Sequence, residues 1–174
     1  HNCPIYKARN CDPLSSFGDF IGYSGTVTVD MAAYLKTQVS DGIIAADFTD
    51  EALEILKHKK NGNYTILKAD KNVFNTYKYK KNTGEYRELY GIGLYQEQRN
   101  LEDLEKIMDI IDTFSVENKV NCSMINDAYI GTLMLNFVPS NSVSFTYNGQ
   151  VVGIGCGQQN RVDCVRIAGN KART

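Results

Sequence analysis

The sequence predicts an α/β fold with a partly parallel sheet. From Phe17 to Leu67 the residue pattern alternates as strand, helix, strand, helix, strand, which is typical of parallel strands joined by helices. The composition, with 43% apolar and 22% charged residues, is ordinary for a globular protein. A chain of 174 residues amounts to one domain and can bury roughly 70% of the surface of its unfolded state.

The first part of the chain is predicted to contain a lead-in, a strand and a helix. Residues 1–13 are polar, include two prolines and lack periodicity, so we expect them to be extended. Leu14–Ile21 is predicted to be a short strand. Gly18 within it marks either a bulge at a sheet edge or part of a functional site. Thr28–Gln38 is predicted to be a helix capped by Thr28, with these apolar residues at helical spacing: Met31, Ala32, Leu35 and Val39.

A turn and a buried strand are expected within Val39–Ala46. Asp41 and Gly42 either form that turn or place a carboxylate at the mouth of the strand, where it could bind sugar hydroxyls. Thr49–Lys60 is the clearest helix, because Thr49 can cap it, acids fill its first turn and a glycine follows it. Its apolar face is made by Leu53, Ile55 and Leu56. We expect Lys57, Lys59 and Lys60 to be solvated, and His58 to be solvated or paired with the helix dipole.

The remaining elements are predicted from local periodicity. Tyr64–Leu67 is expected to be a strand, residues 68–85 an exposed excursion and Tyr86–Gln98 a further strand. Leu101–Phe114 is expected to be an amphipathic helix. Ser123–Phe137 is expected to be a second, more buried helix that Pro139 ends.

The C-terminal stretch combines a hairpin, a glycine-rich bend and a helix. Ser144–Tyr147 and Gln150–Ile154 are predicted strands, because Asn148-Gly149 between them is the strongest two-residue hairpin signal. Three alternating glycines follow, which would let backbone approach a ligand without an intervening side chain: Gly153, Gly155 and Gly157. A helix is expected from about Gln158, with one apolar face made by Val162, Val165, Ile167 and Ala168.

Charge and cysteine content narrow the class of protein. The formal net charge of −1 argues against a nucleic-acid-binding module, and no run approaches the length of a membrane span. Five cysteines without a C-x-x-C pair indicate free thiols in a reducing compartment, and no zinc-ligand cluster is visible. No signal peptide is visible, and the first residue is His1, which indicates either processing or a longer natural protein.

Polar residues on both sides of the hairpin form a candidate site. Asn141 and Ser142 precede it, and Gln158–Arg161 follow it where a strand gives way to a helix, a frequent ligand site in open α/β sheets. Amides and guanidinium groups are suited to binding a planar amide or carboxylate. The alternative is that Asn141 and Ser142 cap the preceding helix and the glutamines are surface residues.

Four stretches in this order resemble the AICAR transformylases, the formyltransferase half of a bifunctional purine-biosynthesis enzyme. They are Leu14-Ser-Ser-Phe-Gly-Asp-Phe20, Val39-Ser-Asp-Gly-Ile-Ile-Ala45, Lys59-Lys-Asn-Gly-Asn-Tyr64 and the whole of Asn141–Ala172. The resemblance implies a layered α/β/α sandwich of the cytidine-deaminase-like class, with a mixed sheet and without the zinc motif. Residues 1–174 would then be the central part of a single transformylase domain.

The resemblance also implies an activity. Members of the family transfer the formyl group of 10-formyltetrahydrofolate to the 5-amine of AICAR ribonucleotide in the synthesis of IMP. A cytoplasmic homodimer is implied, with AICAR ribonucleotide and the folate as its ligands, a structural potassium ion, no zinc, and no nucleic-acid or membrane partner.

Matching positions carry the family's residue roles. Asn141 and Arg161 would hold the carboxamide of the nucleotide, and Asn141 would take part in catalysis. Gly18 and Asp41 would meet the ribose.

The folate and potassium sites are implied in the same way. Leu14 and Val162 would line the folate pocket, and Ser142, within 140–142, would lie in the potassium region.

The sequence departs from the family pattern at several positions. Asn136–Ser140 stands where the family usually has Lys-Tyr-Thr-Gln-Ser, Asn160 replaces a serine, and Cys156 replaces an alanine. A Lys-His motif that the family has upstream and a Phe-Arg segment that it has downstream are absent from these residues. We therefore expect this chain by itself to bind substrate weakly and to be inactive. The alternative is a truncated relative that binds a nucleotide without catalysis.

Overall fold

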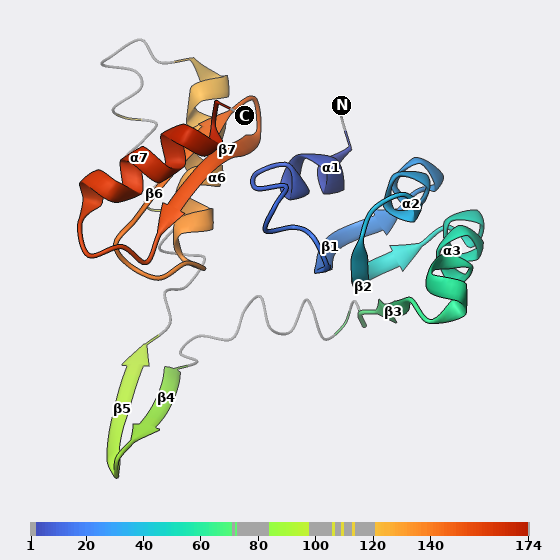
Figure 1. The fold of residues 1–174 in the computed structure, drawn as a ribbon, viewed down its shortest axis with the longest axis horizontal. Helices are drawn as coiled ribbons and strands as arrows, with labels where there is room; N and C mark the ends of the chain where they lie inside the picture. The colour runs from blue at the N-terminus through green and yellow to red at the C-terminus, as the bar shows by residue number, and fades with distance from the viewer. Residues whose placement is uncertain are drawn as a thin grey trace.

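The computed structural model describes residues 3–70, 72, 84–97, 106, 109, 113 and 121–173 (Figure 1). Residues 3–70 form a parallel sheet with helices, residues 84–97 form a hairpin, and residues 121–173 form a helix–hairpin–helix unit. Within these residues, parallel and antiparallel strand pairs occur in separate sheets. The predicted α/β class is confirmed.

The parallel sheet has three strands in the order β1–β2–β3. Their bounds are Asp19–Val27, Ser40–Phe48 and Thr65–Lys68. Ile21 on β1 is paired with Ile43 on β2, which is paired with Ile66 on β3. All three strands run in the same direction, so their amino ends share one edge of the sheet.

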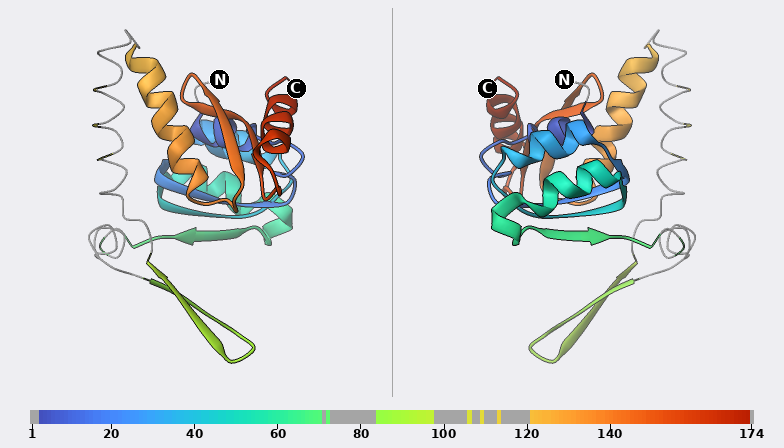
Figure 2. Two further views of the ribbon diagram at one scale, coloured as in Figure 1. Left: turned by 90° about the vertical axis from the view of Figure 1, so that its left-hand side faces the viewer. Right: turned by 90° about the vertical axis from the view of Figure 1, so that its right-hand side faces the viewer.

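Two helices cover one face of this sheet. They are α2 (Val29–Lys36) and α3 (Asp50–Lys57), which lie side by side (Figure 2). A 3-10 helix, η1 (Lys59–Gly62), follows α3 and leads into β3. The predicted alternation of strands and helices in this part of the chain is confirmed.

The segment before β1 differs from the predicted extended lead-in. Pro4–Arg9 form a helix, α1, with a proline at its start, and Ile5 is only 3% exposed. Ile5 joins the core of the parallel sheet, whose buried members are Ile5, Ile21, Val27, Ala32, Leu35, Ile43, Ala45, Ala52, Leu56 and Tyr64. A helix of six residues is too short to show a period, so the sequence pattern did not reveal it.

The predicted strand over Leu14–Ile21 is wrong in its first half. Turns occupy residues 11–18, and β1 begins at Asp19 and continues to Val27. Gly18 has a φ of 77°, in the left-handed region, which ends the turn and lets the strand start. Leu14 and Phe17 are exposed and do not contribute to the core.

The predicted helices of this part are confirmed, with differences at their ends. Thr28 occupies the N-cap of α2 without a side-chain cap hydrogen bond, and Val39 lies beyond the helix and is 46% exposed. In α3 the Thr49 hydroxyl accepts from the Ala52 N–H at 3.2 Å. His58 follows α3, and its Nδ1 lies 2.7 Å from the Glu54 carbonyl oxygen, as expected for a dipole-paired histidine.

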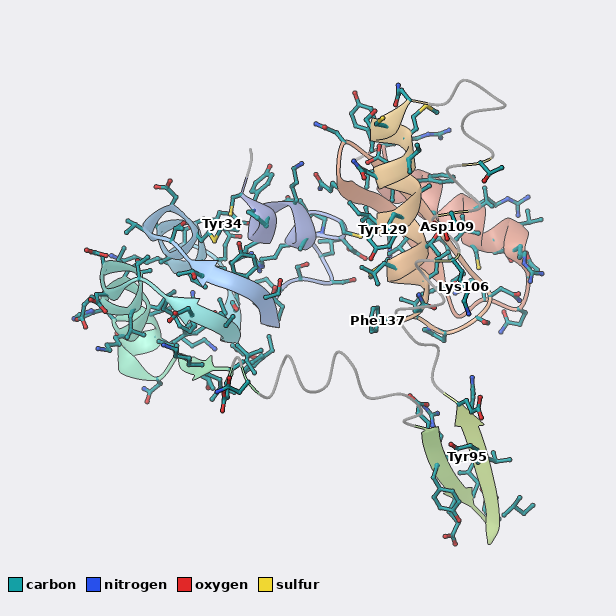
Figure 3. The ribbon with its side chains drawn as sticks, turned by 180° about the vertical axis from the view of Figure 1, so that it is seen from behind. Tyr34, Tyr95, Lys106, Asp109, Tyr129 and Phe137 are labelled. Carbon is teal, nitrogen blue, oxygen red and sulfur yellow. The ribbon has the colours of Figure 1, made fainter. Side chains whose placement is uncertain are left out.

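The hairpin of residues 84–97 replaces the single strand predicted over Tyr86–Gln98. Its strands are β4 (Gly84–Leu89) and β5 (Ile92–Glu97), joined by a turn in which Tyr90 and Gly91 both have positive φ. Every residue of both strands is exposed. Tyr95, labelled on this hairpin in Figure 3, is 65% exposed.

Two other predictions concern residues that the structure largely omits. Most of the helix predicted over residues 101–114 lies outside the described residues, as does most of the excursion predicted over 68–85. Among the described residues, no helix is both long and apolar enough to span a membrane.

In the third part, an antiparallel hairpin lies between two helices. The helices are α6 (Cys122–Leu135) and α7 (Arg161–Lys171), and the strands are β6 (Ser142–Tyr147) and β7 (Gln150–Cys156). Figures 1 and 2 show α6 and α7 on opposite faces of the β6–β7 pair. The Asn148-Gly149 turn has φ values of 52° and 70°, so the predicted hairpin is confirmed.

The two helices of this part differ from the prediction in some of the residues that they bury. Gly131 is the buried residue of α6, whereas Met124 and, just beyond the helix, Phe137 are exposed. The α6 helix is therefore less buried in this chain than its apolar sequence indicates. In α7 the predicted face member Ala168 is buried, as is Cys164, which was not predicted, while the predicted face members Val162 and Val165 are 58% and 45% exposed.

Two polar contacts connect the parallel-sheet part with the third part. Lys7 Nζ on α1 donates to the Asn148 carbonyl oxygen at 2.7 Å. Lys171 Nζ on α7 lies 2.7 Å from Asp12 Oδ2 in the turn after α1. All five cysteines are free, as predicted.

Candidate functional site

Gly18 immediately precedes β1 and Asp41 is near the start of β2, so both lie at the amino-terminal edge of the parallel sheet. The Gly18 N–H donates to the Val39 carbonyl oxygen at 3.0 Å, and no heavy atom lies within 4 Å of the position that a Gly18 Cβ would take. Asp41 is the second residue of β2, is exposed, and forms an ion pair with Lys60 of η1. The structure thus brings together the two residues predicted to contact ribose, and it places Asp41 in a strand instead of a turn.

A buried arginine lies beneath these two positions. Arg9 on α1 is 8% exposed, and its Nε donates to Asp19 Oδ2 at 2.7 Å. Its remaining N–H groups have acceptors at 2.8–3.5 Å, which are Tyr34 Oη, Gln38 Oε1, the Ser16 carbonyl and the Val39 carbonyl. Burial alone would lower the pKa of Arg9, but the hydrogen bonds to Asp19 and Tyr34 outweigh it and raise the pKa. The guanidinium is therefore a permanent cation with every donor engaged.

Lys59 and Tyr64 extend this polar network along the sheet edge. Lys59, predicted to be solvated, is 8% exposed, and its Nζ donates to the Gln38 carbonyl and lies 5.3 Å from the Tyr64 ring centroid. Burial lowers the pKa of Lys59, and the charges of Lys60 and Arg9 lower it further. The Tyr64 hydroxyl lies 3.1 Å from Ser40 Oγ.

Asp19 completes the network with one oxygen unused. The Asp19 carbonyl accepts from Ser40 Oγ at 3.1 Å, and Asp19 Oδ2 is taken by Arg9. Asp19 Oδ1 is buried and has no hydrogen-bond partner among the described residues. A cavity of about 340 Å³ borders Arg9, Ser16 and Asp19.

The sequence analysis missed this network because its members looked ordinary in isolation. Arg9 fell in a segment predicted to be extended, and Lys59 looked like one lysine in a basic helix end. One signal in the sequence could have indicated the helix α1. Pro4 is suited to the first position of a helix, and Ile5 and Arg9 are then one helical turn apart on the same face.

Asn141 holds the loop between β7 and α7. Its Nδ2 donates to the carbonyl oxygens of Gln158 and Gln159 at 3.1 and 3.2 Å, and its backbone N–H donates to Gln158 at 3.2 Å. The Cys164 thiol donates to the Asn141 carbonyl at 3.0 Å. Since two carbonyls fix Nδ2, Asn141 Oδ1 is oriented as an acceptor, and it has no partner within the described residues.

Arg161 and Val162 open α7 and are both exposed. Asn160 caps the helix by accepting from the Asp163 N–H at 2.9 Å, which sets where the helix begins. The Arg161 side chain makes no hydrogen bond or ion pair with any described residue, so its guanidinium is available to a ligand. Asn141 lies beside Gln158 and Gln159, and the convergence of these polar residues on one ligand stays a prediction.

The alternating glycines of β7 serve packing and not ligand approach. A Cβ at Gly153 would lie 2.1 Å from the Ala168 carbonyl oxygen, and one at Gly155 would lie 2.2 Å from the Cys164 carbonyl oxygen. Both glycines therefore let α7 press its backbone against the strand. The interpretation of Gly153 and Gly155 as a ligand-facing surface is wrong.

The predicted folate and potassium residues are more weakly supported by the geometry. Leu14 is 91% exposed on the turn before Gly18, and Val162 is 58% exposed on α7. Ser142 begins β6 opposite Cys156. The Asn141 carbonyl beside Ser142 accepts a hydrogen bond from the Cys164 thiol, and a potassium ion would need several oxygen ligands at once.

The predicted site residues therefore form two groups that do not meet. Leu14, Gly18 and Asp41 belong to the parallel-sheet part, whereas Asn141, Ser142, Arg161 and Val162 belong to the third part. In Figure 1 the amino end of α7 lies on the side of the β6–β7 hairpin that is far from β1. Within the described residues, no hydrogen bond or ion pair links the two groups. Among the residues that the structure describes, no set of three or more His, Cys, Asp or Glu side chains could hold a metal ion.

Comparison with known proteins gives a consistent result over nearly the whole chain. The bifunctional purine biosynthesis protein PurH of Corynebacterium glutamicum strain R is 32% identical over 166 residues, which are 95% of this chain and 30% of that protein. PurH of Prochlorococcus marinus strain MIT 9301 is 33% identical over 163 residues, which are 93% of this chain and 29% of that protein. The chain thus spans about 30% of the length of the curated relatives it matches.

A family model gives the same assignment. The model described as the AICARFT/IMPCHase bienzyme matches residues 4–171, from the first turn of α1 to the end of α7. The resemblance seen in the sequence is confirmed at the level of the family. The chain belongs to the AICARFT/IMPCHase bienzyme family.

Proposed function

We propose that the protein containing this chain transfers the formyl group of 10-formyltetrahydrofolate to the 5-amino group of AICAR ribonucleotide, in the purine pathway to IMP. The family match and the purine biosynthesis relatives support this activity. The observation that carries it within the chain is the side-chain amide of Asn141, which is fixed by two carbonyls so that its oxygen is free to accept.

The free oxygen of Asn141 suits the demands of the reaction. The 5-amine is conjugated with the imidazole and its carboxamide, so it is a poor nucleophile and gains from being oriented. An amide oxygen that accepts from an N–H of the amine or the adjacent carboxamide would orient the nitrogen toward the formyl carbon. The exposed guanidinium of Arg161 would donate to the carboxamide oxygen.

The parallel-sheet group would bind the sugar. Gly18 leaves open space beside its Cα, and the Asp41 carboxylate can accept from both ribose hydroxyls while Lys60 holds it. Leu14 and Val162 are apolar and exposed, as required of side chains that a pterin ring would cover.

The separation of the two groups supports a homodimer with the site between subunits. Gly18 and Asp41 of one subunit would then face Asn141 and Arg161 of the other, and a twofold axis would create two such sites. The fold would be a cytidine-deaminase-like α/β/α sandwich once the rest of the domain is present. Potassium, if bound, would need oxygen ligands in addition to Ser142.

The test is formyl transfer by the natural full-length protein. Asn141→Ala should lower the rate by at least about tenfold, or about 1.4 kcal/mol of barrier, because the amine loses its acceptor. The readout is tetrahydrofolate release at saturating AICAR ribonucleotide, with thermal unfolding showing that the variant remains folded.

Asn170→Ala is the matched control, since Asn170 is exposed near the end of α7. An unchanged rate in Asn141→Ala would remove Asn141 from the site. Binding of AICAR ribonucleotide in calorimetry without any turnover by the unsubstituted full-length protein would instead establish the alternative, a nucleotide-binding relative without catalysis.

A further inference from the structure

Both predicted ribose contacts follow loops that one buried side chain holds. Ser16 lies two residues before Gly18, and Val39 lies two residues before Asp41. Arg9 Nη2 donates to the Ser16 carbonyl at 2.8 Å and to the Val39 carbonyl at 3.1 Å. The same Val39 carbonyl also accepts from the Gly18 N–H at 3.0 Å, so three hydrogen bonds fix the spacing of the two loops.

The other donors of Arg9 fix the position of the guanidinium itself. Nε binds the Asp19 carboxylate immediately after Gly18, and Nη1 binds Gln38 Oε1 immediately before Val39. Arg9 also contacts Tyr34 of α2, which Figure 3 shows beside α1. Since the planar fork supplies five donors in a fixed geometry, no other side chain can satisfy this set of acceptors.

Arg9 cannot itself touch a nucleotide, because it is 8% exposed and each of its N–H groups already has an acceptor in the protein. We propose that Arg9 is a positioning residue for the nucleotide, whose guanidinium sets the distance between Gly18 and Asp41. The inference rests on the proposed function and adds a residue to it. Its consequence is that the nucleotide affinity depends on the shape of the guanidinium as well as on its charge.

Arg9→Lys in the natural full-length protein tests this directly. Lysine keeps the positive charge beside Asp19 but is a point charge that cannot bind both loop carbonyls and the carboxylate together. We expect the KM for AICAR ribonucleotide to rise by about tenfold, with the KM for the folate and the kcat at saturating nucleotide little changed. Lys7→Ala on the same helix is the matched control, since the Lys7 side chain donates to the distant Asn148 carbonyl and to none of the acceptors of Arg9, and its three constants should match those of the unsubstituted protein.

Chemical rescue separates positioning from stability. In Arg9→Ala, millimolar guanidinium chloride should restore nucleotide affinity, because the cavity of about 340 Å³ beside Arg9 gives the ion access to the vacated acceptors. Equal concentrations of methylammonium chloride should not do so, and Lys7→Ala should gain nothing from either salt. If neither Arg9 variant folds, Gln38→Leu removes one acceptor of the guanidinium, and its KM for the nucleotide should rise by a smaller factor with the same selectivity.

The outcomes are distinguishable. Formyl transfer by the unsubstituted protein, combined with an unchanged KM for the nucleotide in Arg9→Lys or in Gln38→Leu, would overturn the role of Arg9 and leave the proposed function standing. An equal rise of both KM values would also overturn it, because that result indicates a general loss of folded structure. No transfer to AICAR ribonucleotide by the unsubstituted protein would overturn the proposed function, and the role of Arg9 with it.

Discussion

Gly18 and Gly22 are four residues apart and differ in the backbone conformation that a side chain at each position would have to adopt. Neither has a heavy atom within 4 Å of a hypothetical Cβ, so both have room for a methyl group. Gly18 has a φ of 77°, whereas Gly22 lies within β1 with no positive φ. The requirement for glycine at position 18 is therefore conformational and not steric.

Gly18→Ala should lower the free energy of unfolding by about 1–2 kcal/mol, the cost of placing an L-residue in the left-handed region. Gly22→Ala is the control and should be neutral or slightly stabilising, because alanine restricts the unfolded chain without strain in the strand. Urea unfolding of both variants measures the difference. Equal stability of the two variants would show that the turn can change its conformation.

At the scale of elements, one carboxylate connects α6 to the turn of the β6–β7 hairpin. Asp127 Oδ2 accepts from the Asn148 N–H at 2.9 Å, and Oδ1 accepts from the Gly149 N–H at 2.6 Å. On the hairpin side, Ser144 Oγ donates to the Gly131 carbonyl at 3.2 Å. The helix thus satisfies the turn amides that the hairpin itself leaves without partners.

Asp127→Ala should leave both turn amides without an acceptor and destabilise the third part by about 1–2 kcal/mol. Hydrogen exchange at Asn148 and Gly149 should become faster, while amides in the middle of β7 keep their protection. Asn126→Ala, at the neighbouring exposed position of α6, should change neither quantity. Unaltered exchange at the two turn amides in Asp127→Ala would mean that water replaces the carboxylate without loss.

Elements were predictable where local signals agreed with the fold. For α3, a capping threonine and an apolar face placed the start of the helix where expected, although the helix ends at Lys57 and residues 59–62 form η1. The face of α7 was predicted correctly for Ala168 but not for the valines, because the packing surface of β7 is made of glycines and the small residues Cys164 and Ala168 face the strand. The turn of β4–β5 was missed because Tyr90-Gly91 is a weaker hairpin signal than Asn-Gly.

The candidate site, too, was predictable in some of its residues and not in others. Gly18 and Asp41 come together because parallel strands start at one edge, which follows from the order of elements. The spacing of Pro4, Ile5 and Arg9 could have indicated the helix that carries Arg9, but not its acceptors, which lie up to 30 residues away and depend on how α1 packs. Local patterns contain no information about such distant partners.

For the whole molecule, the contact between Asp12 and Lys171 joins the first turn region to the last helix. The two side chains are 16% and 34% exposed. Burial alone would raise the pKa of Asp12, but hydrogen bonds from Lys171 and Ser15 outweigh it and hold the pKa below its usual value. A carboxyl group whose folded pKa is depressed stabilises the fold above its unfolded pKa and loses that contribution as the pH falls through the folded value.

Asp12→Asn should therefore reduce the stability at pH 7 by about 1 kcal/mol. The difference from the unsubstituted protein should persist down to about pH 4, near the unfolded pKa of an aspartate, and should vanish at lower pH, where Asp12 itself is protonated. Urea unfolding at a series of pH values measures this. A difference that stays constant into strong acid would show that the carboxylate charge is not the cause.

The close approach of α7 to β7 has a consequence for how this sequence can change over generations. At Gly153 and Gly155 the atoms that exclude a side chain are backbone carbonyl oxygens of Ala168 and Cys164. No replacement at 164 or 168 can remove a carbonyl oxygen, so no compensating mutation in the helix could permit a larger residue in the strand. The two glycines should therefore be retained in descendants of this chain even where the helix sequence drifts.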